Sequence, residues 1–592
     1  MQREIKKRVY VYGFAAVLLA ILLGSLCYNL EVNLQFGKPN QPTPPIETSP
    51  QQPLTALKTF SSYDELRSFL ANTSIVPGEF LFFGPLDYKV LGVYPLGPEV
   101  RTANIEYSTT NVQVAGVDEA DIVKTDGEYI YVVSGNNVSI LKAYPTEEAG
   151  LVSKIVYNDM CPVGIFVSQS HDRLAVLGCE YFIPKFYYGY YYVNIKTRID
   201  LYDVSNKTNP VFLKNFTISG SYFNSRMIGD YVYFVVSQPA YIIYDTVILP
   251  KIYTKEGIKE INATEIYYHN VTEDYYLYTT IVAFNIQNAT EEATYKTIML
   301  GETSCMYVSL NNVYITFRET YENTTIYRIR IENNTITPEA VGSVLGHPLN
   351  QFSMDEYNSY FRIATTAWVN GVPQNNLYML DMNLSIIGKL ENFAPVGEIM
   401  DSARFIGNRC YLSTSTPRKD PFFVIDVENA TDPKILGNLS ITGFTRYLHP
   451  YDENHIIGLG VDGSNVKISV YDVSNVTAPK NITEYKIDGY WSDTLALTEH
   501  EAFLFDKAKE LLVIPVTVYY QDYSSWYGVY VFKINLEEGL VLRGNVTHQE
   551  NNTYYFITRA LYIENVLYTI SEREIKMNDI ETLELKNKIE LS

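Results

Sequence analysis

One eight-residue pattern recurs three times in this chain with the same internal spacing. The copies are Asp203–Pro210, Asp426–Pro433 and Asp472–Pro479, and each reads Asp-Val-x-Asn-x-Thr-x-Pro. Each copy follows a short run of β-forming residues inside a unit of about 45–50 residues, a period typical of sheet-based repeats. The repeat therefore indicates one architecture built from many copies of a small antiparallel sheet.

The composition favours a β-rich chain and argues against nucleic-acid binding. Of the 592 residues, 46% are hydrophobic, and the 52 tyrosines suit half-buried pleated surfaces. The formal net charge is −21, whereas a nucleic-acid-binding protein needs a basic face to neutralise phosphates. An acidic surface promotes solubility, so the charge by itself identifies no partner.

Tight turn signals between short apolar runs predict β-hairpins along the chain. Gly229-Asp230 and Gly407-Asn408 are two such turns. Each hairpin is followed by a third strand, which can end in the eight-residue pattern, and then by a fourth strand such as 435–439. Four antiparallel strands in this order form the blade of a β-propeller. We therefore predict an all-β propeller of four-stranded antiparallel blades.

The number of hairpins predicts eight or nine blades. Propellers usually have four to eight, so a count of nine leaves open that one blade has been divided in two. The segment Gln238–Thr279 interrupts one unit and is predicted to be an insertion between strands. The candidate hairpins begin near Asp121, Gly164, Arg226, Cys305, Phe352, Ser402, Tyr447, Thr494 and Thr558.

An apolar segment near the N-terminus predicts a membrane anchor. Arg3–Arg8 contains four basic residues and Val9–Tyr28 contains no charge, which is long enough to span a hydrocarbon core of about 30 Å. The basic flank favours a single-pass protein whose chain after Tyr28 lies outside the cell. A cleaved signal peptide has a similar basic flank and apolar run, and in that alternative the protein is secreted.

Two further features define the organisation of the chain before the repeats. Gly37–Pro53 is rich in Pro and Gln and predicts an extended stalk. Ser62–Glu65 has the form of a capping box and predicts a short helix over about 62–71. We divide the chain into a cytoplasmic flank with the anchor (1–30), the stalk (31–58), a helix and lead-in (59–117) and the propeller (118–592).

Asn-x-Ser/Thr sequons are more than twice as frequent as the roughly six expected by chance, which indicates N-glycosylation outside the cell. Six of them fall in turns after third strands and should share one end of the ring: Asn206, Asn288, Asn333, Asn383, Asn429 and Asn475. Four fall in or beside fourth strands: Asn215, Asn438, Asn481 and Asn545. The others are Asn72, Asn137, Asn262, Asn270, Asn323 and Asn551. Glycans at these positions would leave the opposite mouth of the ring accessible.

Four cysteines lie outside the apolar segment, which is compatible with two disulfides in an oxidising compartment. Cys161 and Cys179 flank a hairpin-like run, so their Cα atoms could approach bridging distance. The alternative for this pair, and more so for Cys305 and Cys410, is that each is a small buried hydrophobe.

Five longer motifs carry a family resemblance. They are Asn111–Gly127, Asn350–Glu356, Arg362–Thr366, Ser402–Phe405 and Tyr447–Pro450. These motifs resemble an archaeal and bacterial family of secreted proteins described as a C-terminal β-propeller domain distantly related to WD-type repeats. The resemblance extends from about Thr59 to the C-terminus. It implies a propeller at the cell surface and supplies no catalytic residues.

The common enzyme motifs are missing from the sequence. It contains no Gly-x-Ser-x-Gly elbow, no Gly-rich phosphate loop with Lys and no His-Glu-x-x-His motif. We therefore predict no catalytic residues and no cofactor. Asp118, Glu119, Asp121 and Asp126 form the densest acidic cluster and could bind Ca²⁺, although their spacing does not match a calcium loop. Structural hydrogen bonds are the reading we favour for them.

Blade geometry predicts a ligand or partner site at one mouth of the channel. If the first strand of each hairpin is innermost, polar residues near its start gather around the opening fed by fourth-to-first connections. The alternative is that these residues pair with one another and hold the blades in register. The candidates are Arg226, Gln351, Ser353, Asp401, Arg404, Arg446, His449, Asp493 and Arg559.

These features together predict a membrane-anchored, glycosylated extracellular propeller that acts as a binding module of the cell envelope. Its partner would be an extracellular protein or a glycan. A second hypothesis is a secreted carbohydrate-active hydrolase or lyase whose carboxylates and arginines meet at the channel mouth. A third is a purely structural envelope protein.

Overall fold

The structure is a computed structural model. It describes residues 57–71, 105–181, 185–187, 190–192, 195–243, 245–269, 276–301, 303–318, 322–415, 420–550 and 553–591. The predicted anchor and stalk lie outside these residues. Within them, no helix is both long and apolar enough to cross a membrane.

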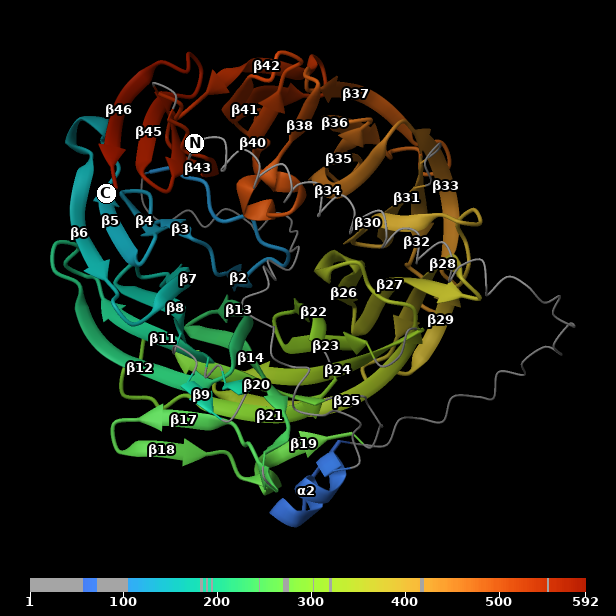
Figure 1. Cartoon of the computed structure of the whole chain (residues 1–592). Helices are drawn as coiled ribbons and strands as arrows, with labels where there is room; N and C mark the ends of the chain where they lie inside the picture. The colour runs from blue at the N-terminus through green and yellow to red at the C-terminus, as the bar shows by residue number, and fades with distance from the viewer. Residues whose placement is uncertain are drawn as a thin grey trace, which may run out of the picture. The chain divides into compact units, whose positions relative to one another are not determined.

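Nine blades, each with a core of four antiparallel strands, follow one another in the described part of the chain and form the ring seen in Figure 1. Six are four-stranded sheets, and three are extended by further strands. This is the larger of the two predicted blade numbers. We number these blades 1 to 9 in chain order. The first strand of each lies innermost and the fourth outermost (Figure 1).

The strands of blades 1 to 4 are as follows. Blade 1 contains β3 (Val123–Thr125), β4 (Tyr129–Ser134), β5 (Asn137–Lys142) and β6 (Gly150–Val156); blade 2 contains β7 (Cys161–Val167), β8 (Arg173–Tyr181), β11 (Ile195–Asp203) and β12 (Val211–Ser219); blade 3 contains β13 (Ser221–Ile228), β14 (Tyr231–Ala240), β20 (Tyr276–Asn285) and β21 (Thr294–Leu300); blade 4 contains β22 (Thr303–Val308), β23 (Asn312–Arg318), β24 (Asn323–Glu332) and β25 (Thr335–Leu345).

The strands of blades 5 to 9 are as follows. Blade 5 contains β26 (Met354–Tyr357), β27 (Tyr360–Val369), β28 (Val372–Leu380) and β29 (Ile386–Leu390); blade 6 contains β30 (Ile399–Ile406), β31 (Arg409–Ser415), β32 (Asp420–Asp426) and β33 (Lys434–Ile441); blade 7 contains β34 (Phe444–Asp452), β35 (His455–Asp462), β36 (Asn465–Asp472) and β37 (Lys480–Lys486); blade 8 contains β38 (Trp491–Asp493) and β39 (Leu504–Asp506), which both pair with β40 (Leu511–Tyr519), then β41 (Ser525–Asn535) and β42 (Gly539–Val546); blade 9 contains β43 (Ile557–Ile563), β44 (Val566–Ser571), β45 (Glu574–Asp579) and β46 (Leu585–Glu590).

The eight-residue pattern forms the turn between the third and fourth strands of blades 2, 6 and 7. In each copy the Asp carboxylate accepts the N–H two residues later, and the Asn side chain accepts the Thr N–H and hydroxyl. These are two consecutive Asx turns, in which side-chain hydrogen bonds to the local backbone reverse the direction of the chain between the two strands. The Val between them is buried in all three copies, so the pattern encodes both the turn and its attachment to the core.

The same turns identify the two ends of the ring. Val204, Val427 and Val473 donate their N–H groups to carbonyls of Asp172, Asn408 and Asn454, which lie between the first and second strands of the same blade. Turns after first strands and turns after third strands therefore share one end, as antiparallel order requires. We call this end the first-turn end.

Blades 1 and 9 close the ring without exchanging a strand, since each is built from consecutive strands. Their facing sides share one apolar core that includes Ile130, Leu141, Ile575 and Met577. The Tyr568 hydroxyl also donates to the Ala143 carbonyl across this junction (2.8 Å). Closure depends on side-chain packing between the two blades rather than on a shared sheet.

The predicted insertion between β14 and β20 lies on the outer rim. It contains β15 (Ile242–Ile243), β16 (Thr246–Val247), β17 (Lys251–Thr254), β18 (Gly257–Glu260), η2 (Ala263–Glu265) and β19 (Ile266–Tyr268). The β17–β18 hairpin extends blade 2, and β19 extends blade 3 by pairing with β21. A further short hairpin, β9 (Lys185–Tyr187) and β10 (Tyr190–Tyr192), follows β8.

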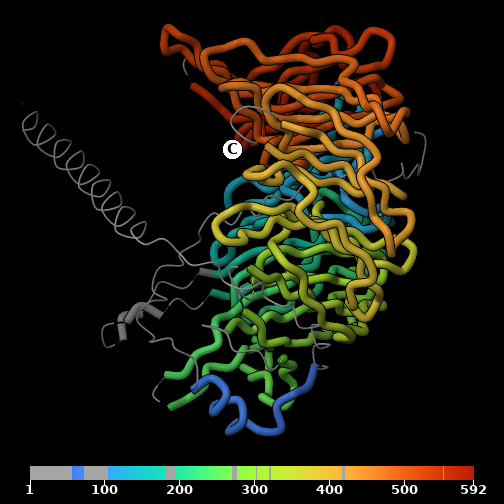
Figure 2. The backbone as a smooth tube through the Cα atoms, turned by 90° about the vertical axis from the view of Figure 1, so that its right-hand side faces the viewer, coloured from blue at the N-terminus to red at the C-terminus, as the bar shows by residue number. Residues whose placement is uncertain are grey.

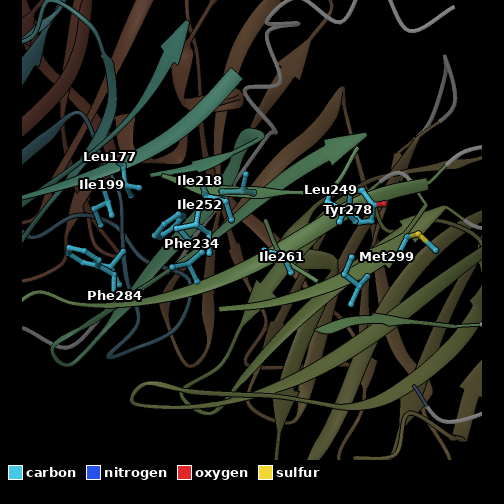
Figure 3. Close-up of a cluster of buried hydrophobic side chains, with 14 of the residues drawn as sticks. Leu177, Ile199, Ile218, Phe234, Leu249, Ile252, Ile261, Tyr278, Phe284 and Met299 are labelled. Carbon is cyan, nitrogen blue, oxygen red and sulfur yellow. The ribbon is translucent and has the colours of Figure 1, made fainter. Parts of the chain in front are cut away.

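The predicted N-terminal helix is present as α2 (Tyr63–Ala71) and packs on this insertion, beside β1 (Lys58–Thr59), which pairs with β19 (Figures 1 and 2). Leu66 and Leu70 are buried in the apolar core between blades 2 and 3 and the insertion, part of which is drawn in Figure 3. The Ser62 hydroxyl accepts the Glu65 N–H, as a capping box requires, whereas the Glu65 carboxylate accepts the N–H of Ser61.

Candidate functional site

Residues 105–122, which we call the lead-in segment, cross the interior of the ring before blade 1 begins. Tyr107 forms an antiparallel bridge with Ile563 of β43, and β2 (Asp118–Glu119) pairs with β13. The Asn111 amide donates to the carbonyls of His500 and Phe503, in and just after η5 (His500–Ala502). The segment is visible as a blue trace within the ring in Figure 1. It therefore connects blades from different sides of the channel.

Two of the predicted arginines are ion-paired with this segment. Arg226 Nη2 lies 2.9 Å from Glu119 Oε2, and Arg559 Nε lies 2.9 Å from Asp121 Oδ1. Arg559 also contacts Glu499 at 2.8 Å. Burial lowers the pKa of Arg559, but the carboxylates of Asp121, Glu501 and Glu499 outweigh this effect and raise it. These arginines hold the lead-in segment to the blades.

The acidic cluster that could have bound Ca²⁺ is divided among different partners. Asp118 accepts from Lys124 Nζ (2.7 Å), Glu119 pairs with Arg226 and Asp121 pairs with Arg559. Asp126 accepts the backbone N–H groups that close the β3–β4 turn. The described residues contain no group of three potential metal ligands from His, Cys, Asp and Glu. Each of the four carboxylates has hydrogen-bond or ion-pair partners within the protein.

Gln351 and Ser353 are also part of the internal network. Both lie in η3 (Gln351–Ser353), immediately before β26. The Gln351 side chain donates to Gln113 of the lead-in segment and accepts from Arg226. The Ser353 hydroxyl accepts the N–H of Leu349. Gln351 therefore links blade 5 to the lead-in segment, whereas Ser353 makes a local contact that holds the turn before β26.

A cavity of about 1050 Å³ lies between the lead-in segment and the inner strands of blades 1, 2, 3, 7, 8 and 9. Aromatic rings of Tyr107, Phe503, Phe505 and Tyr562 line it together with charged and polar groups. The polar lining includes Asp118, Asp121, Lys124, His449, Glu501, Asp506, Lys507 and Arg559. We call this space the central cavity.

The central cavity reaches the first-turn end of the ring. Ser170, His171, Gly229 and Lys507 line it, and all belong to turns between first and second strands. We had expected the functional mouth at the other end. The expectation placed the arginines at the start of their first strands. Instead, β13 and β30 begin five residues before Arg226 and Arg404, so these arginines lie near the ends of their strands.

His449 is the candidate residue that best fits ligand binding in this cavity. It is buried, its Nδ1 lies 2.7 Å from the Tyr447 hydroxyl, and its Nε2 has no hydrogen-bond partner. The Asn111 side-chain nitrogen, Nδ2, donates to the Tyr447 hydroxyl oxygen. The same atom lies next to two backbone carbonyl oxygens, which accept hydrogen bonds, so it is the nitrogen of the amide.

Burial and the nearby Arg404 guanidinium lower the pKa of His449 to about 3. The ring is consequently neutral under ordinary conditions. Phe503 and Phe505 hold it from two sides, with ring centroids 4.9 and 5.1 Å from that of His449. The result is a fixed, neutral imidazole beside the central cavity, with its Nε2 atom buried.

Glu501 is a functional candidate that the sequence reasoning missed. It lines the central cavity, and burial raises the pKa of its carboxyl although Arg559 opposes the shift. The sequence signal was confined to His500-Glu501, which lacks a second histidine at metal-ligand spacing. Only the fold brings this carboxyl beside Arg559, 58 positions later in the chain.

Arg446 and Asp493 do not line the central cavity. Their side chains are exposed. Arg446 lies at a register shift between Thr445 and Tyr447, which are both buried. A β-bulge leaves one residue unpaired and turns it away from the regular alternation.

Asp401 lies at a comparable register shift in β30. Its side chain is half-buried, and burial raises the pKa of its carboxyl.

Arg404 is buried beside Phe352, with its guanidinium carbon 4.6 Å from the ring centroid. It lines a smaller cavity of about 200 Å³, which shares no lining residue with the central cavity.

The cysteine geometry was predicted in part. Cys161 and Cys179 lie directly opposite each other in the β7–β8 pair, as the hairpin indicated. Both are free thiols in the structure, as are Cys305 and Cys410. The last two are buried in blades 4 and 6, which agrees with the alternative of small buried hydrophobes.

The ten sequons assigned to repeated positions lie where the blade order placed them. Six fall in turns between third and fourth strands and four fall in the outermost strands β12, β33, β37 and β42. All ten Asn side chains are exposed. The turn sequons share the first-turn end with the central cavity, but they belong to outer turns of the blades.

Comparisons with known proteins agree with this architecture. Residues 107–583 match the family model described as "Beta propeller domain". An uncharacterized protein of Archaeoglobus fulgidus is 26% identical over 91% of this chain and 95% of its own length. An uncharacterized protein of Methanocaldococcus jannaschii is 28% identical over 98% of this chain and 97% of its own length.

Matches to solved structures are weaker. A protein from Lactobacillus plantarum aligns with 12% identity and a TM-score of 0.31, covering 54% of this chain and 93% of that protein. Dihydro-heme d1 dehydrogenase NirN aligns with 12% identity and a TM-score of 0.28, covering 62% and 74%. At these TM-scores the matches carry no inference about ligand or chemistry.

Proposed function

Because this chain belongs to the Beta propeller domain family, we propose that it is a binding module of the cell envelope, anchored in the membrane, glycosylated and exposed outside the cell. The ligand that we propose is a saccharide unit of a surface glycan, held in the central cavity. The observation that carries this proposal is the cavity of about 1050 Å³, which is of a size that suits small-molecule and oligomeric ligands.

The composition of the cavity wall supports a saccharide. Rings such as Tyr107 and Phe505 offer flat apolar faces, and charged side chains such as Lys124 and Asp506 offer hydrogen-bonding groups. Sugars present apolar ring faces edged by hydroxyl groups, so they match a wall in which both kinds of group alternate. The alternative ligand is a loop of a partner protein inserted into the same cavity.

The test is a glycan-array screen with the protein from residue 57 onward. Ala508 lies on the exposed rim of the cavity, so Ala508→Trp should block entry while leaving the core unchanged. Ala71→Trp on the exposed end of α2 is the matched control. We expect binding that Ala508→Trp abolishes and Ala71→Trp retains. An array without a hit, or a hit that survives Ala508→Trp, would contradict the proposal.

The anchor and the glycans are tested on native protein. We expect Val9–Tyr28 to be retained and the protein to fractionate with membranes. We also expect peptide mass spectrometry to find glycans at the exposed turn sequons such as Asn206, Asn429 and Asn475. A mature N-terminus near residue 28–40 would instead indicate signal-peptide cleavage.

A carbohydrate-active hydrolase is the second candidate, and Glu501 is the observation that favours it. Its carboxyl lines the central cavity, and its raised pKa would keep a proton available near neutral pH. Glycoside hydrolysis requires a protonated carboxyl opposite an ionised one, and Asp121 also lines this cavity. Release of reducing sugar from an array ligand, lost in Glu501→Gln, would establish this activity over simple binding.

A further inference from the structure

Arg404 is a buried guanidinium without an acidic partner. Only 4% of the residue is exposed, and its Nε has no hydrogen-bond partner. No ion pair to this guanidinium is found among the residues that the structure describes. Three other buried arginines, Arg226, Arg362 and Arg559, each have a carboxylate within 3 Å. Arg404 therefore differs from arginines in the same part of the fold.

The surroundings of Arg404 supply little negative charge, and the contribution of Asp355 raises the pKa of Arg404 less than burial lowers it. Asp355 lines the same small cavity, but its carboxylate accepts two hydrogen bonds from Arg362. His449 is close enough for the Arg404 charge to lower its pKa, so it is neutral. The face of Phe352 provides a cation–π contact (4.6 Å), which is weak compared with the loss of hydration on burial.

The guanidinium nevertheless keeps its charge. Burial lowers the pKa of Arg404 to about 10, which still leaves it protonated at neutral pH. A buried charge without a partner is costly, so such groups in folded proteins are normally paired with a counter-ion. The cavity of about 200 Å³ beside Arg404 has room for one, since a single water occupies about 30 Å³ of liquid.

We propose that the cavity lined by Arg404, Phe352, Asp355 and Pro450 is a binding site for an oxyanion such as a sulfate, phosphate or carboxylate group. The planar fork of an arginine matches these groups, because two parallel N–H donors can reach two oxygens. The oxyanion is either a free inorganic ion or the acid group of a larger ligand such as a uronic acid. This site is separate from the central cavity and does not depend on the saccharide proposed there.

The test measures stabilisation of the protein from residue 57 onward by sulfate, phosphate, acetate and glucuronate, with chloride at equal ionic strength as the reference. A ligand that binds the folded state raises Tm in a saturable way. We expect such a rise with at least one of these anions. A rise with the inorganic ions identifies a free-ion site, whereas a rise with glucuronate alone identifies an acidic sugar.

Arg404→Met should abolish the rise, and Arg446→Met is the matched control because Arg446 occupies the neighbouring first strand with an exposed side chain. We also expect Arg404→Met without added anion to melt no lower than the wild type, since the change removes an uncompensated charge. No saturable rise in the wild type, or an equal rise in Arg404→Met, would overturn the proposal.

A direct measurement keeps the proposal testable if Arg404→Met does not fold. Wild-type crystals soaked in selenate should show an anomalous peak within hydrogen-bonding distance of the Arg404 guanidinium. Arg404→Lys, which keeps the charge but loses the fork, should reduce the occupancy of this peak. A cavity without selenate at saturating concentration would exclude an oxyanion site.

Discussion

Arg559 lies among three carboxylates, and its removal tests how strongly the lead-in segment is held. Arg559→Met would leave the buried Asp121 and the half-buried Glu499 without this cation. Breaking a buried pair by removing one partner costs about 3–5 kcal/mol. We expect urea unfolding to report a loss of this size, whereas the exposed Arg446→Met should stay within about 0.5 kcal/mol of the wild type. Equal values for the two variants would contradict the assignment.

His449 makes stability depend on pH with a definite sign. Its pKa falls from an ordinary 6.5 to about 3 in the folded state, chiefly through burial. The unfolded chain therefore binds the proton more readily. The contribution of neutral His449 to stability is complete above pH 6.5 and is lost as pH falls toward 3, at about 1.4 kcal/mol per pH unit.

The corresponding variant is His449→Gln, which keeps an acceptor for the Tyr447 hydroxyl. Between pH 7 and pH 5 we expect the wild type to lose about 2 kcal/mol more unfolding free energy than the variant does. Denaturant titrations of both proteins at the two pH values provide the comparison. Parallel pH dependence of the two proteins would show that folding does not lower the pKa of His449.

For single residues, the sequence identified the polar side chains of the first strands but not the partners that they contact. Arg226, Arg404, His449 and Arg559 all lie in first strands and are buried. Their partners could not be predicted, because Glu119 and Asp121 meet arginines 107 and 438 positions away. Pairings of that separation depend on the path of the lead-in segment, for which the sequence contains no periodic signal.

The Asx turns of the eight-residue pattern make a prediction at the scale of elements. Asp426 Oδ1 accepts the Glu428 N–H and pairs with Arg409 at the start of β31 (2.7 Å). Asp426→Ala loses both contacts and should cost about 1–2 kcal/mol. Asp426→Asn keeps the acceptor for the backbone and should cost less than about 1 kcal/mol, because the pair is partly solvated. Thermal unfolding that ranks the two variants equally would contradict this role.

The eight-residue pattern was informative because a turn is encoded locally, by side chains that bond their own backbone. Bulges near the start of the first strands were not predicted. Register shifts leave Phe223, Asp401 and Arg446 unpaired, and none of the three is buried. A bulge shifts alternation by one residue and exchanges inward for outward positions. Regular alternation therefore assigned Arg446 to the channel incorrectly.

For the whole molecule, the hairpin count limited the number of blades to eight or nine, and the repeat pattern identified the four-stranded unit. Ring closure had no sequence signal, since blades 1 and 9 meet through side-chain packing and share no strand. The lead-in segment supplements this closure from inside. It bridges β43 of blade 9, pairs with β13 of blade 3 and then enters blade 1.

Deletion of the lead-in segment tests this role. A chain that begins at residue 123 retains every strand of the nine blades but loses Glu119 and Asp121, the partners of Arg226 and Arg559. Asn111 is lost as well, which leaves carbonyls of blade 8 without their donor. We expect the chain to lose at least the cost of one broken buried pair, about 3–5 kcal/mol, or to unfold in more than one step.

A chain that begins at residue 105 is the proper reference for this deletion, because both chains lack β1 and α2. Comparison of that reference with a chain from residue 57 gives the separate contribution of the rim helix. Denaturant unfolding followed by both tyrosine fluorescence and far-UV circular dichroism reports whether the transition stays cooperative. Coincident transitions with equal midpoints for the chains from 105 and 123 would show that packing between blades 1 and 9 suffices to close the ring.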